Sequence, residues 1–176
     1  MTTMATHPPF RRSPADVSSI RLVPAKDMAV VRALFTEYAD SLGLDLSFQG
    51  FEEELAGLPG RYAAPDGAIF LSEVDGEAVG CVAVRPLAGP GGCEMKRLYV
   101  RAGWTGHGLG RRLAEAAIAA ARERRYTVMR LDTLTSMTEA NILYNHLGFR
   151  RIEPYYRNPL PGALFYELSL LSLIDA

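Results

Sequence analysis

Residues that hold metals or form cross-links are scarce in this chain. Only three histidines are present, His7, His107 and His146, and none has metal-ligand spacing with another ligand, so no metal site is predicted. The two cysteines, Cys81 and Cys93, lie in apolar runs that are typical of strands. This placement favours two buried free thiols in a cytoplasmic protein, with a disulfide as the alternative.

Long apolar segments and a surplus of charge of one sign are absent as well. No run approaches the roughly 20 apolar residues that a membrane helix needs. A net charge of −1 gives no electrostatic reason to expect nucleic acid or a membrane surface as a partner. Residues 1–17 contain prolines and arginines but no apolar core of a secretion signal. They are predicted to be a flexible leader before one domain at 18–176.

Turn signals and apolar periodicity divide the domain into strands and helices. Strands are predicted at 20–23, 68–74, 78–85, 93–100, 128–133, 149–152 and 163–170. Helices are predicted from the N-cap Asp27 to Gly43, at 51–58, at about 108–125, and from a capping box of Ser136 and Glu139 to about 147. A meander followed by a strand–helix–strand crossover implies an α/β (α+β) fold. We expect a single mixed, mostly antiparallel sheet of about 6–7 strands with helices on both faces.

A glycine-rich turn at 100–111 joins a strand to the long helix. Gly106, Gly108 and Gly110 alternate, so backbone amides can approach a ligand closely, and they lead into a helix N-terminus that favours an anion. The pattern predicts phosphate binding. A tight turn without a ligand is the alternative, although one glycine would suffice for that. The dinucleotide fingerprint and the P-loop sequence are both absent.

With these residues in view, the chain resembles the GNAT family of acetyl-CoA-dependent N-acetyltransferases. Residues 105–110, Thr-Gly-His-Gly-Leu-Gly, resemble the family's R/Q-G-x-G-x-G/A motif. Residues 140–149, with Ala140, Tyr144 and Phe149, resemble its C-terminal A-x-x-L-Y-x-x-x-G-F motif. Residues 94–100 look like its fourth strand. The resemblance covers about residues 18–172 and implies the GNAT-like acyl-CoA N-acyltransferase fold.

The resemblance also implies that acetyl-CoA binds as co-substrate, with its pantetheine arm along a splayed fourth strand. The implied cofactor-binding residues are Leu98, Tyr99, Val100, Thr105, Gly106, His107, Gly108, Leu109, Gly110, Arg111 and Asn141. Two positions depart from the family pattern. Thr105 replaces the usual Arg or Gln, and Met137 replaces an Asn whose role Asn141, on the same helix face, could take.

The resemblance assigns two catalytic roles. Glu94 matches the carboxylate that acts as general base, and strand alternation predicts that every second residue from Glu94 to Val100 shares its face. Tyr144 matches the general acid that protonates the leaving thiolate. A surface carboxylate and a packed core tyrosine are the respective alternatives.

The loop at 153–162 combines aromatic, cationic and proline residues, which suits a specificity pocket. Tyr155, Tyr156 and Arg157 are candidate substrate contacts, with plain surface packing as the alternative. An arginine there would suit an acceptor that bears a carboxylate.

Together these features predict an enzyme that moves an acetyl group from acetyl-CoA to a primary amine of a small molecule or peptide. Transfer is expected by direct attack, because no motif places a cysteine as nucleophile. An acetyl-CoA sensor without efficient turnover and an acyltransferase for longer acyl-CoAs are the alternatives. The resemblance also makes a homodimer possible.

Overall fold

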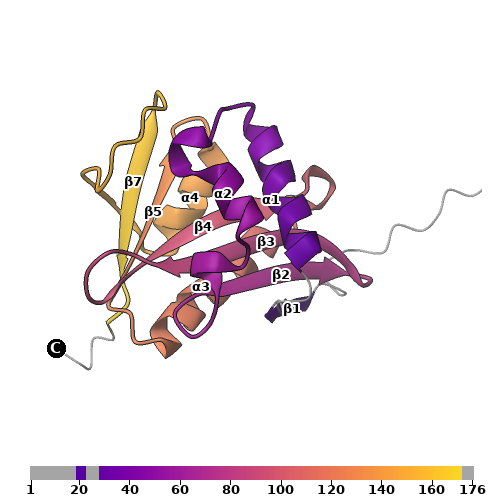
Figure 1. The fold of residues 1–176 in the computed structure, drawn as a ribbon, viewed down its shortest axis with the longest axis horizontal. Helices are drawn as coiled ribbons and strands as arrows, with labels where there is room; N and C mark the ends of the chain where they lie inside the picture. The colour runs from indigo at the N-terminus through magenta and orange to yellow at the C-terminus, as the bar shows by residue number, and fades with distance from the viewer. Residues whose placement is uncertain (1–18, 23–27, 172–176) are drawn as a thin grey trace, which may run out of the picture.

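The computed structural model describes residues 19–22 and 28–171, which form one seven-stranded sheet with helices on both faces (Figure 1). The strands follow the order β1-β2-β3-β4-β5-β7-β6 across the sheet. The predicted leader at 1–17 and the predicted N-cap Asp27 lie outside the described residues. None of the helices in the described part of the chain is long and apolar enough to cross a membrane.

The elements occur in the predicted order. The strands are β1 (Ser19–Leu22), β2 (Ala68–Val74), β3 (Glu77–Pro86), β4 (Gly92–Val100), β5 (Val128–Leu134), β6 (Arg150–Ile152) and β7 (Ala163–Ser169). The helices are α1 (Met28–Leu42), α2 (Phe51–Ala56), α3 (Leu109–Glu123) and α4 (Thr138–His146), with short 3₁₀ turns η3 (Ser47–Gln49), η4 (Gly60–Tyr62) and η5 (Ala102–Trp104). All sheet neighbours are antiparallel except β4 and β5. The predicted mixed, mostly antiparallel sheet is therefore confirmed.

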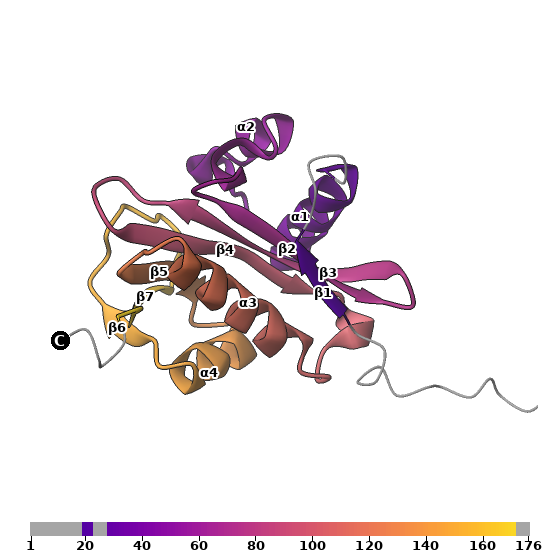
Figure 2. The same cartoon turned by 90° about the horizontal axis from the view of Figure 1, so that it is seen from below.

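Helices cover both faces of the sheet, as Figure 2 shows, and an apolar cluster lies on each face. Helices α3 and α4 pack on one face, with Leu113, Ala117 and Met95 in the same cluster. Helices α1 and α2 pack on the other, with Phe35 and Phe51. Both cysteines are free and buried, as predicted. Cys81 belongs to the α1 layer and Cys93 to the α3 layer, so the sheet itself keeps the thiols apart.

A β-bulge in β4 changes which side chains share a face. Arg97 has φ of 58°, and the register with β3 shifts between Cys81 and Ala83. A bulge inserts an extra residue and reverses the alternation beyond it. Lys96 therefore points to the α1 layer, whereas Leu98 packs against the α3 layer. The predicted common face from Glu94 to Val100 is wrong for this reason.

The start of α4 also differs from the prediction. The helix begins at Thr138, its N-cap is Met137, and no side chain caps it. The predicted capping box of Ser136 and Glu139 is wrong, because Ser136 lies one position too early to be the N-cap. Its place is instead on the wall of the cleft described below.

Candidate active site

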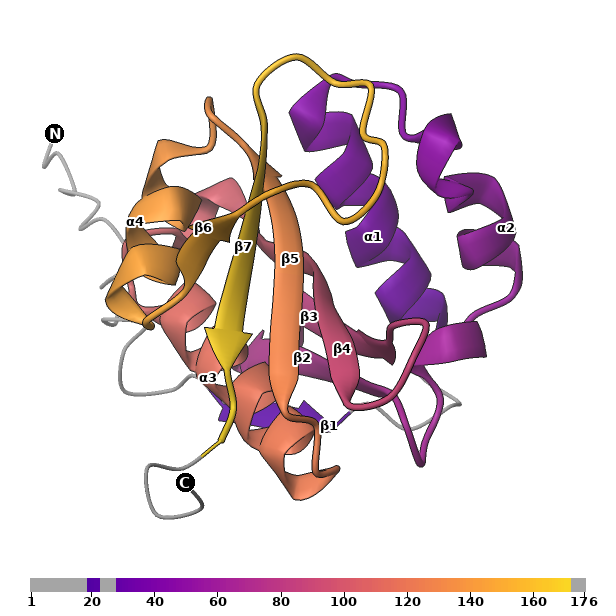
Figure 3. The ribbon, with the colours of Figure 1, turned by 90° about the vertical axis from the view of Figure 1, so that its left-hand side faces the viewer.

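A cleft opens where β4 and β5 separate. Their parallel ladder holds only three residue pairs, the last of which is Glu94 with Arg130. Beyond this point the strands diverge, as Figure 3 shows for the two ribbons. Leu98, Tyr99 and Val100, which lie on β4 beyond this point, line a cleft of about 570 Å³. The splayed fourth strand implied by the family resemblance is therefore present.

The glycine-rich turn forms one end of this cleft. Gly106 and Gly108 have φ of 79° and 77°, a left-handed conformation that other residues rarely adopt. Gly108 is the N-cap of α3, so the amides of the first helical turn, from Leu109 on, have no partner within the helix. Unpaired amides at a helix N-terminus attract an anion. The turn thus offers the predicted phosphate-binding geometry at the mouth of the cleft.

Most of the residues predicted to bind the cofactor line the cleft. They are Leu98, Tyr99, Val100, Thr105, Gly106, Gly108, Leu109, Gly110 and Arg111. His107 and Asn141 do not line it. The Asn141 amide donates to the Leu134 carbonyl at 2.9 Å and so fastens α4 to β5. The Thr105 hydroxyl donates to the Ala102 carbonyl at 3.0 Å and closes the turn.

The opposite wall of the cleft was missed by sequence reasoning. Residues 136–140, at the start of α4, line it together with Trp104 and with Tyr38 and Ser41 of α1. Ser136 and Thr138 are small polar residues at the start of a helix, which is a signal for a cap as much as for a ligand. Only the fold shows that this helix start faces the cleft.

A small polar cavity lies beside the inner part of the cleft. This inner cavity has a volume of about 30 Å³. Its lining residues are Tyr38, Gln49, Met95, Lys96, Arg97, Leu98, Asp132, Thr133, Met137 and Tyr144. Tyr38, Leu98 and Met137 also line the cleft, so the two spaces share a wall. Its volume is about that of one water molecule in the liquid.

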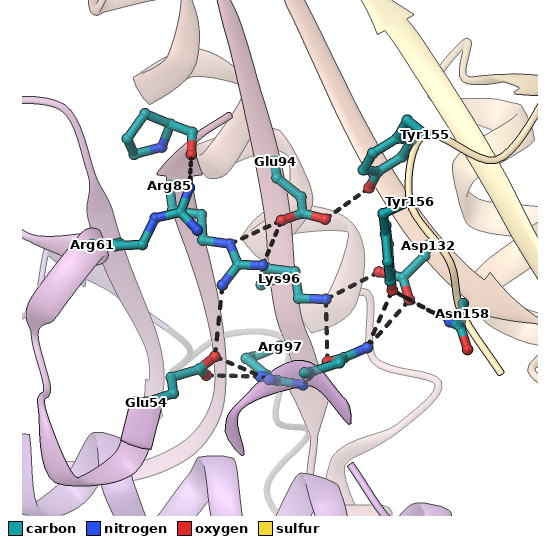
Figure 4. A network of polar contacts seen from close by, with 12 residues as sticks. Glu54, Arg61, Arg85, Glu94, Lys96, Arg97, Asp132, Tyr155, Tyr156 and Asn158 are labelled. Carbon is teal, nitrogen blue, oxygen red and sulfur yellow. Dashed lines mark hydrogen bonds and ion pairs between the residues drawn. The ribbon is translucent and has the colours of Figure 1, made fainter. Parts of the chain in front are cut away.

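Six charged side chains form a buried ion network, three of which, Lys96, Arg97 and Asp132, line the inner cavity (Figure 4). Its members are Glu54, Arg85, Glu94, Lys96, Arg97 and Asp132. Arg97 holds Glu54 through two hydrogen bonds of 2.9 and 3.0 Å and lies over the Phe51 ring. Lys96 pairs with Asp132 at 3.0 Å. Three cations and three carboxylates balance, as buried charges require.

The GNAT acetyltransferase family model matches residues 31–149, more than half of this chain. The chain belongs to the GNAT family. It is 39% identical to an uncharacterized N-acetyltransferase of Schizosaccharomyces pombe, over 89% of this chain and 97% of that protein. The acyltransferase class predicted from the sequence is confirmed.

Solved structures agree with this GNAT membership. A putative acyl-CoA N-acyltransferase from Klebsiella pneumoniae has a TM-score of 0.68 at 29% identity, covering 88% of this chain and 98% of the other. A putative acetyltransferase from Salmonella typhimurium was solved with its cofactor acetyl-CoA. It has the same fold, with a TM-score of 0.67 at 21% identity and coverage of 88% and 94%.

Tyr144, the candidate general acid of this GNAT protein, lies at the wall of the inner cavity. Its ring packs edge-on against Phe149 at 5.7 Å and lies 6.2 Å from Tyr166. Burial, together with the nearby Tyr38 and Asp132, raises the pKa of the Tyr144 hydroxyl. The hydroxyl therefore keeps its proton at neutral pH. The tyrosine is both a core residue and a cavity residue.

Glu94, the candidate general base, does not line the cleft or the inner cavity. Its side chain is 2% exposed. Arg85 donates to one carboxylate oxygen through two nitrogens at 2.8 Å, and the Tyr155 hydroxyl donates to the other at 2.7 Å. Both oxygens thus accept hydrogen bonds from neighbouring side chains, and the role of Glu94 as general base stays a prediction.

Asp132, in the middle of β5, is the carboxylate that lines the inner cavity. Lys96 donates to its Oδ1, and the Tyr156 hydroxyl donates to its Oδ2 at 2.7 Å. Burial alone would raise the pKa of Asp132, but the Lys96 charge and the Tyr156 hydrogen bond outweigh it and lower the pKa. Sequence reasoning missed Asp132, since a lone aspartate in a strand carries no motif.

The loop between β6 and β7 brings the two tyrosines predicted as substrate contacts to the network. Tyr155 reaches Glu94, and Tyr156 reaches Asp132. Arg157 is exposed and points to neither carboxylate by any described contact. Asn158, which the sequence did not single out, donates to Asp132 at 3.1 Å. The loop therefore forms one side of the site. The hydroxyl groups of Tyr155 and Tyr156 and the side-chain amide of Asn158 hold the two carboxylates in place.

Proposed function

We propose that this GNAT protein transfers the acetyl group of acetyl-CoA to a primary amine of a small molecule or peptide. The proposal rests on the spatial order of the binding groups along the cleft. Unpaired helix amides lie at its mouth, free backbone of β4 lies along it, and a polar cavity with Tyr144 adjoins its inner part. This order matches the phosphates, the amide-bearing arm and the thioester of acetyl-CoA.

Each part of the cofactor has a matching group. The amides after Gly108 suit the pyrophosphate. The backbone from Leu98 to Val100 has no partner on β5, so it can pair with the amides of the pantetheine arm as an added strand would. Arg111 also lines the cleft and adds a positive charge near the α3 N-terminus. Its guanidinium also forms an ion pair with the Glu115 carboxylate, with 3.5 Å between nitrogen and oxygen. The acetyl-CoA bound to the Salmonella typhimurium protein, which shares this fold, supports the same choice.

The residues around the inner cavity suit direct transfer. Amine attack on a thioester requires a group that takes a proton from nitrogen and a group that gives one to sulfur. Tyr144 supplies the second, because its buried hydroxyl stays protonated. Glu94, the residue that the family resemblance assigns to the first role, accepts hydrogen bonds from Tyr155 and Arg85.

Acetyl-CoA is the proposed acyl donor, because the Salmonella typhimurium acetyltransferase that shares this fold was solved with acetyl-CoA.

An amine panel tests the proposed function. The protein is incubated with acetyl-CoA and single amines, including amino acids, amino acid amides, polyamines and short peptides. Release of CoA thiol is measured beside the acetylated product by mass spectrometry. We expect thiol release above blank with at least one amine, and faster turnover with acetyl-CoA than with longer acyl-CoAs. Acetyl-CoA binding by calorimetry without release for any amine would instead identify a sensor.

A further inference from the structure

The inner cavity is lined by the Asp132 carboxylate and adjoins the part of the cleft where the thioester is proposed to lie. Asp132 is the one carboxylate among its described lining residues, and Tyr144 lines the same cavity. Tyr38, Leu98 and Met137 line both this cavity and the cleft, so the two spaces adjoin at these residues. A group that bridges Asp132 and a thioester at this end of the cleft would occupy the space of about 30 Å³.

The size and polarity of this cavity suit one water molecule. A buried water needs two to four polar partners and room for about one probe sphere. Lys96, Asp132 and Thr133 supply charged and hydroxyl groups on the wall. A water there can accept a hydrogen bond from an amine on the cleft side and donate one to the carboxylate.

The Asp132 carboxylate is fixed in one orientation. Lys96 holds its Oδ1, while Tyr156 and Asn158 both donate to Oδ2. Gln49 of η3 also donates to Oδ2 at 3.4 Å, so β4, η3 and the loop between β6 and β7 converge on this one carboxylate of β5. A fixed carboxylate needs no reorganisation when positive charge appears on a nearby nitrogen.

Glu94 differs from Asp132 in position, because both carboxylates accept hydrogen bonds on both oxygens. Glu94 lines neither the cleft nor the inner cavity, and it lies where β4 and β5 are still paired, before the strands separate. The bulge at Arg97 follows it, so the strand backbone that lines the cleft begins only at Leu98.

We propose that Asp132, rather than Glu94, is the catalytic residue that receives the proton of the acceptor amine, through one water in the inner cavity. The inference rests on the proposed function. As the amine nitrogen bonds to the acetyl carbon, one N–H bond breaks and its proton passes to the water, which gives a proton to Asp132. The carbon–sulfur bond breaks, and the thiolate takes the Tyr144 proton. Asp132 then returns a proton to Tyr144 through the cavity, so the net transfer is one proton from nitrogen to sulfur.

A matched pair of variants tests the proposal. Asp132→Asn and Glu94→Gln each remove one charge from the same buried ion network without changing its shape. General-base removal typically lowers a rate by about 100-fold or more, so we expect kcat of Asp132→Asn to fall by at least that factor. Glu94→Gln is expected to keep kcat within about tenfold of the unchanged protein, a smaller loss than removal of a proton acceptor causes. Both should keep the acetyl-CoA Kd, because neither residue lines the cleft.

A second measurement separates proton transfer from a structural defect. Ethylamine and trifluoroethylamine, used at high concentration, share one skeleton but differ in basicity. After attack, the proton on the less basic nitrogen is more acidic, so water alone removes it more easily. The rate of the unchanged protein divided by the rate of Asp132→Asn should therefore be smaller for trifluoroethylamine than for ethylamine. A misfolded variant would lose both rates by the same factor.

The possible outcomes have distinct meanings. A kcat for Asp132→Asn within about threefold of the unchanged protein, with retained Kd, overturns the assignment of Asp132, because a general base contributes far more. A large loss in Glu94→Gln alone returns the role to Glu94. Equal loss with both amines also counts against Asp132. If the unchanged protein binds acetyl-CoA but acetylates no amine, the proposed function fails and this inference fails with it.

Discussion

Tyr144 shows how one residue can serve packing and chemistry together. Its ring belongs to the α3-side core, between Phe149 and Tyr166, and its hydroxyl end is at the inner cavity. A rigid ring fixes the position of the hydroxyl more closely than a flexible side chain on the surface would. The two sequence-level interpretations of Tyr144, core residue and acid, are therefore compatible.

Tyr144→Phe should lower kcat while leaving acetyl-CoA affinity unchanged. The substitution keeps the ring packing and removes only the hydroxyl group, so we expect a loss of about 100-fold in kcat, the low end of the range for an acid–base group. Steady-state kinetics and calorimetry with acetyl-CoA measure the two effects. Tyr166→Phe is the matched control, since Tyr166 is buried in the same ring cluster but lines neither the cleft nor the inner cavity. Equal losses in both variants would show that the hydroxyl of Tyr144 has no special role.

At the scale of single residues, the sequence was informative where a motif existed. The glycines of the turn and Tyr144 belong to recognisable patterns, and the structure places them at the cleft or the inner cavity. Asp132 and Asn158 belong to no pattern. They meet only because β5 and the loop after β6 are brought together by the sheet, a long-range contact that local sequence does not encode.

The turn between β4 and α3 is the element on which cofactor binding depends. Gly108→Val should weaken acetyl-CoA binding at least about tenfold, because a β-branched residue at φ of 77° is strained by about 1–2 kcal/mol and moves the amides. Gly76→Val is the matched control, because Gly76 has φ of 83° in the hairpin between β2 and β3 and lines neither space. Calorimetry gives the affinity, and thermal unfolding gives the stability. We expect similar destabilisation in both variants but weaker binding only in Gly108→Val, and equal affinity in the two would move the phosphate site elsewhere.

The elements themselves were largely predictable, because hydrophobic period and turn residues identify them locally. All seven strands and four helices occur in the predicted order. The bulge at Arg97 was not predictable from alternation, which assumes that every residue of a strand is paired. Its effect is large: Lys96 and Arg97 are consecutive, yet both face the α1 layer and enter the same network.

The buried ion network joins the α1 layer to the sheet across the whole molecule. Arg97→Met should destabilise the fold by about 3–5 kcal/mol, because it leaves Glu54 buried and deprived of its main partner. Arg130→Met is the matched control, since Arg130 and Glu167 are about one-third exposed and such pairs contribute about 0–1 kcal/mol. Urea unfolding followed by circular dichroism measures both. A loss for Arg97→Met no larger than that for Arg130→Met would mean that α2 is held by its apolar contacts alone.

Asp132 also links whole-molecule stability to pH. Its folded pKa lies below the unfolded value, so it contributes stability that is fully present above the unfolded pKa and is lost as pH falls through the folded pKa. Asp132→Asn removes this contribution. We therefore expect the stability of the unchanged protein to fall more steeply with acidification below about pH 4 than that of the variant. Urea midpoints measured from pH 3 to pH 7 test the slope, and parallel curves would contradict the lowered pKa.

The separation of β4 from β5 has a consequence for association between molecules. Unpaired strand backbone at the outer edge of a sheet invites any exposed strand of another protein, which promotes aggregation. Here the unpaired backbone lies inside the sheet, between two of its own strands, and the starts of α3 and α4 line the opening. Only a slender extended ligand can reach it, so the same hydrogen-bonding groups that suit a pantetheine arm are withheld from neighbouring chains.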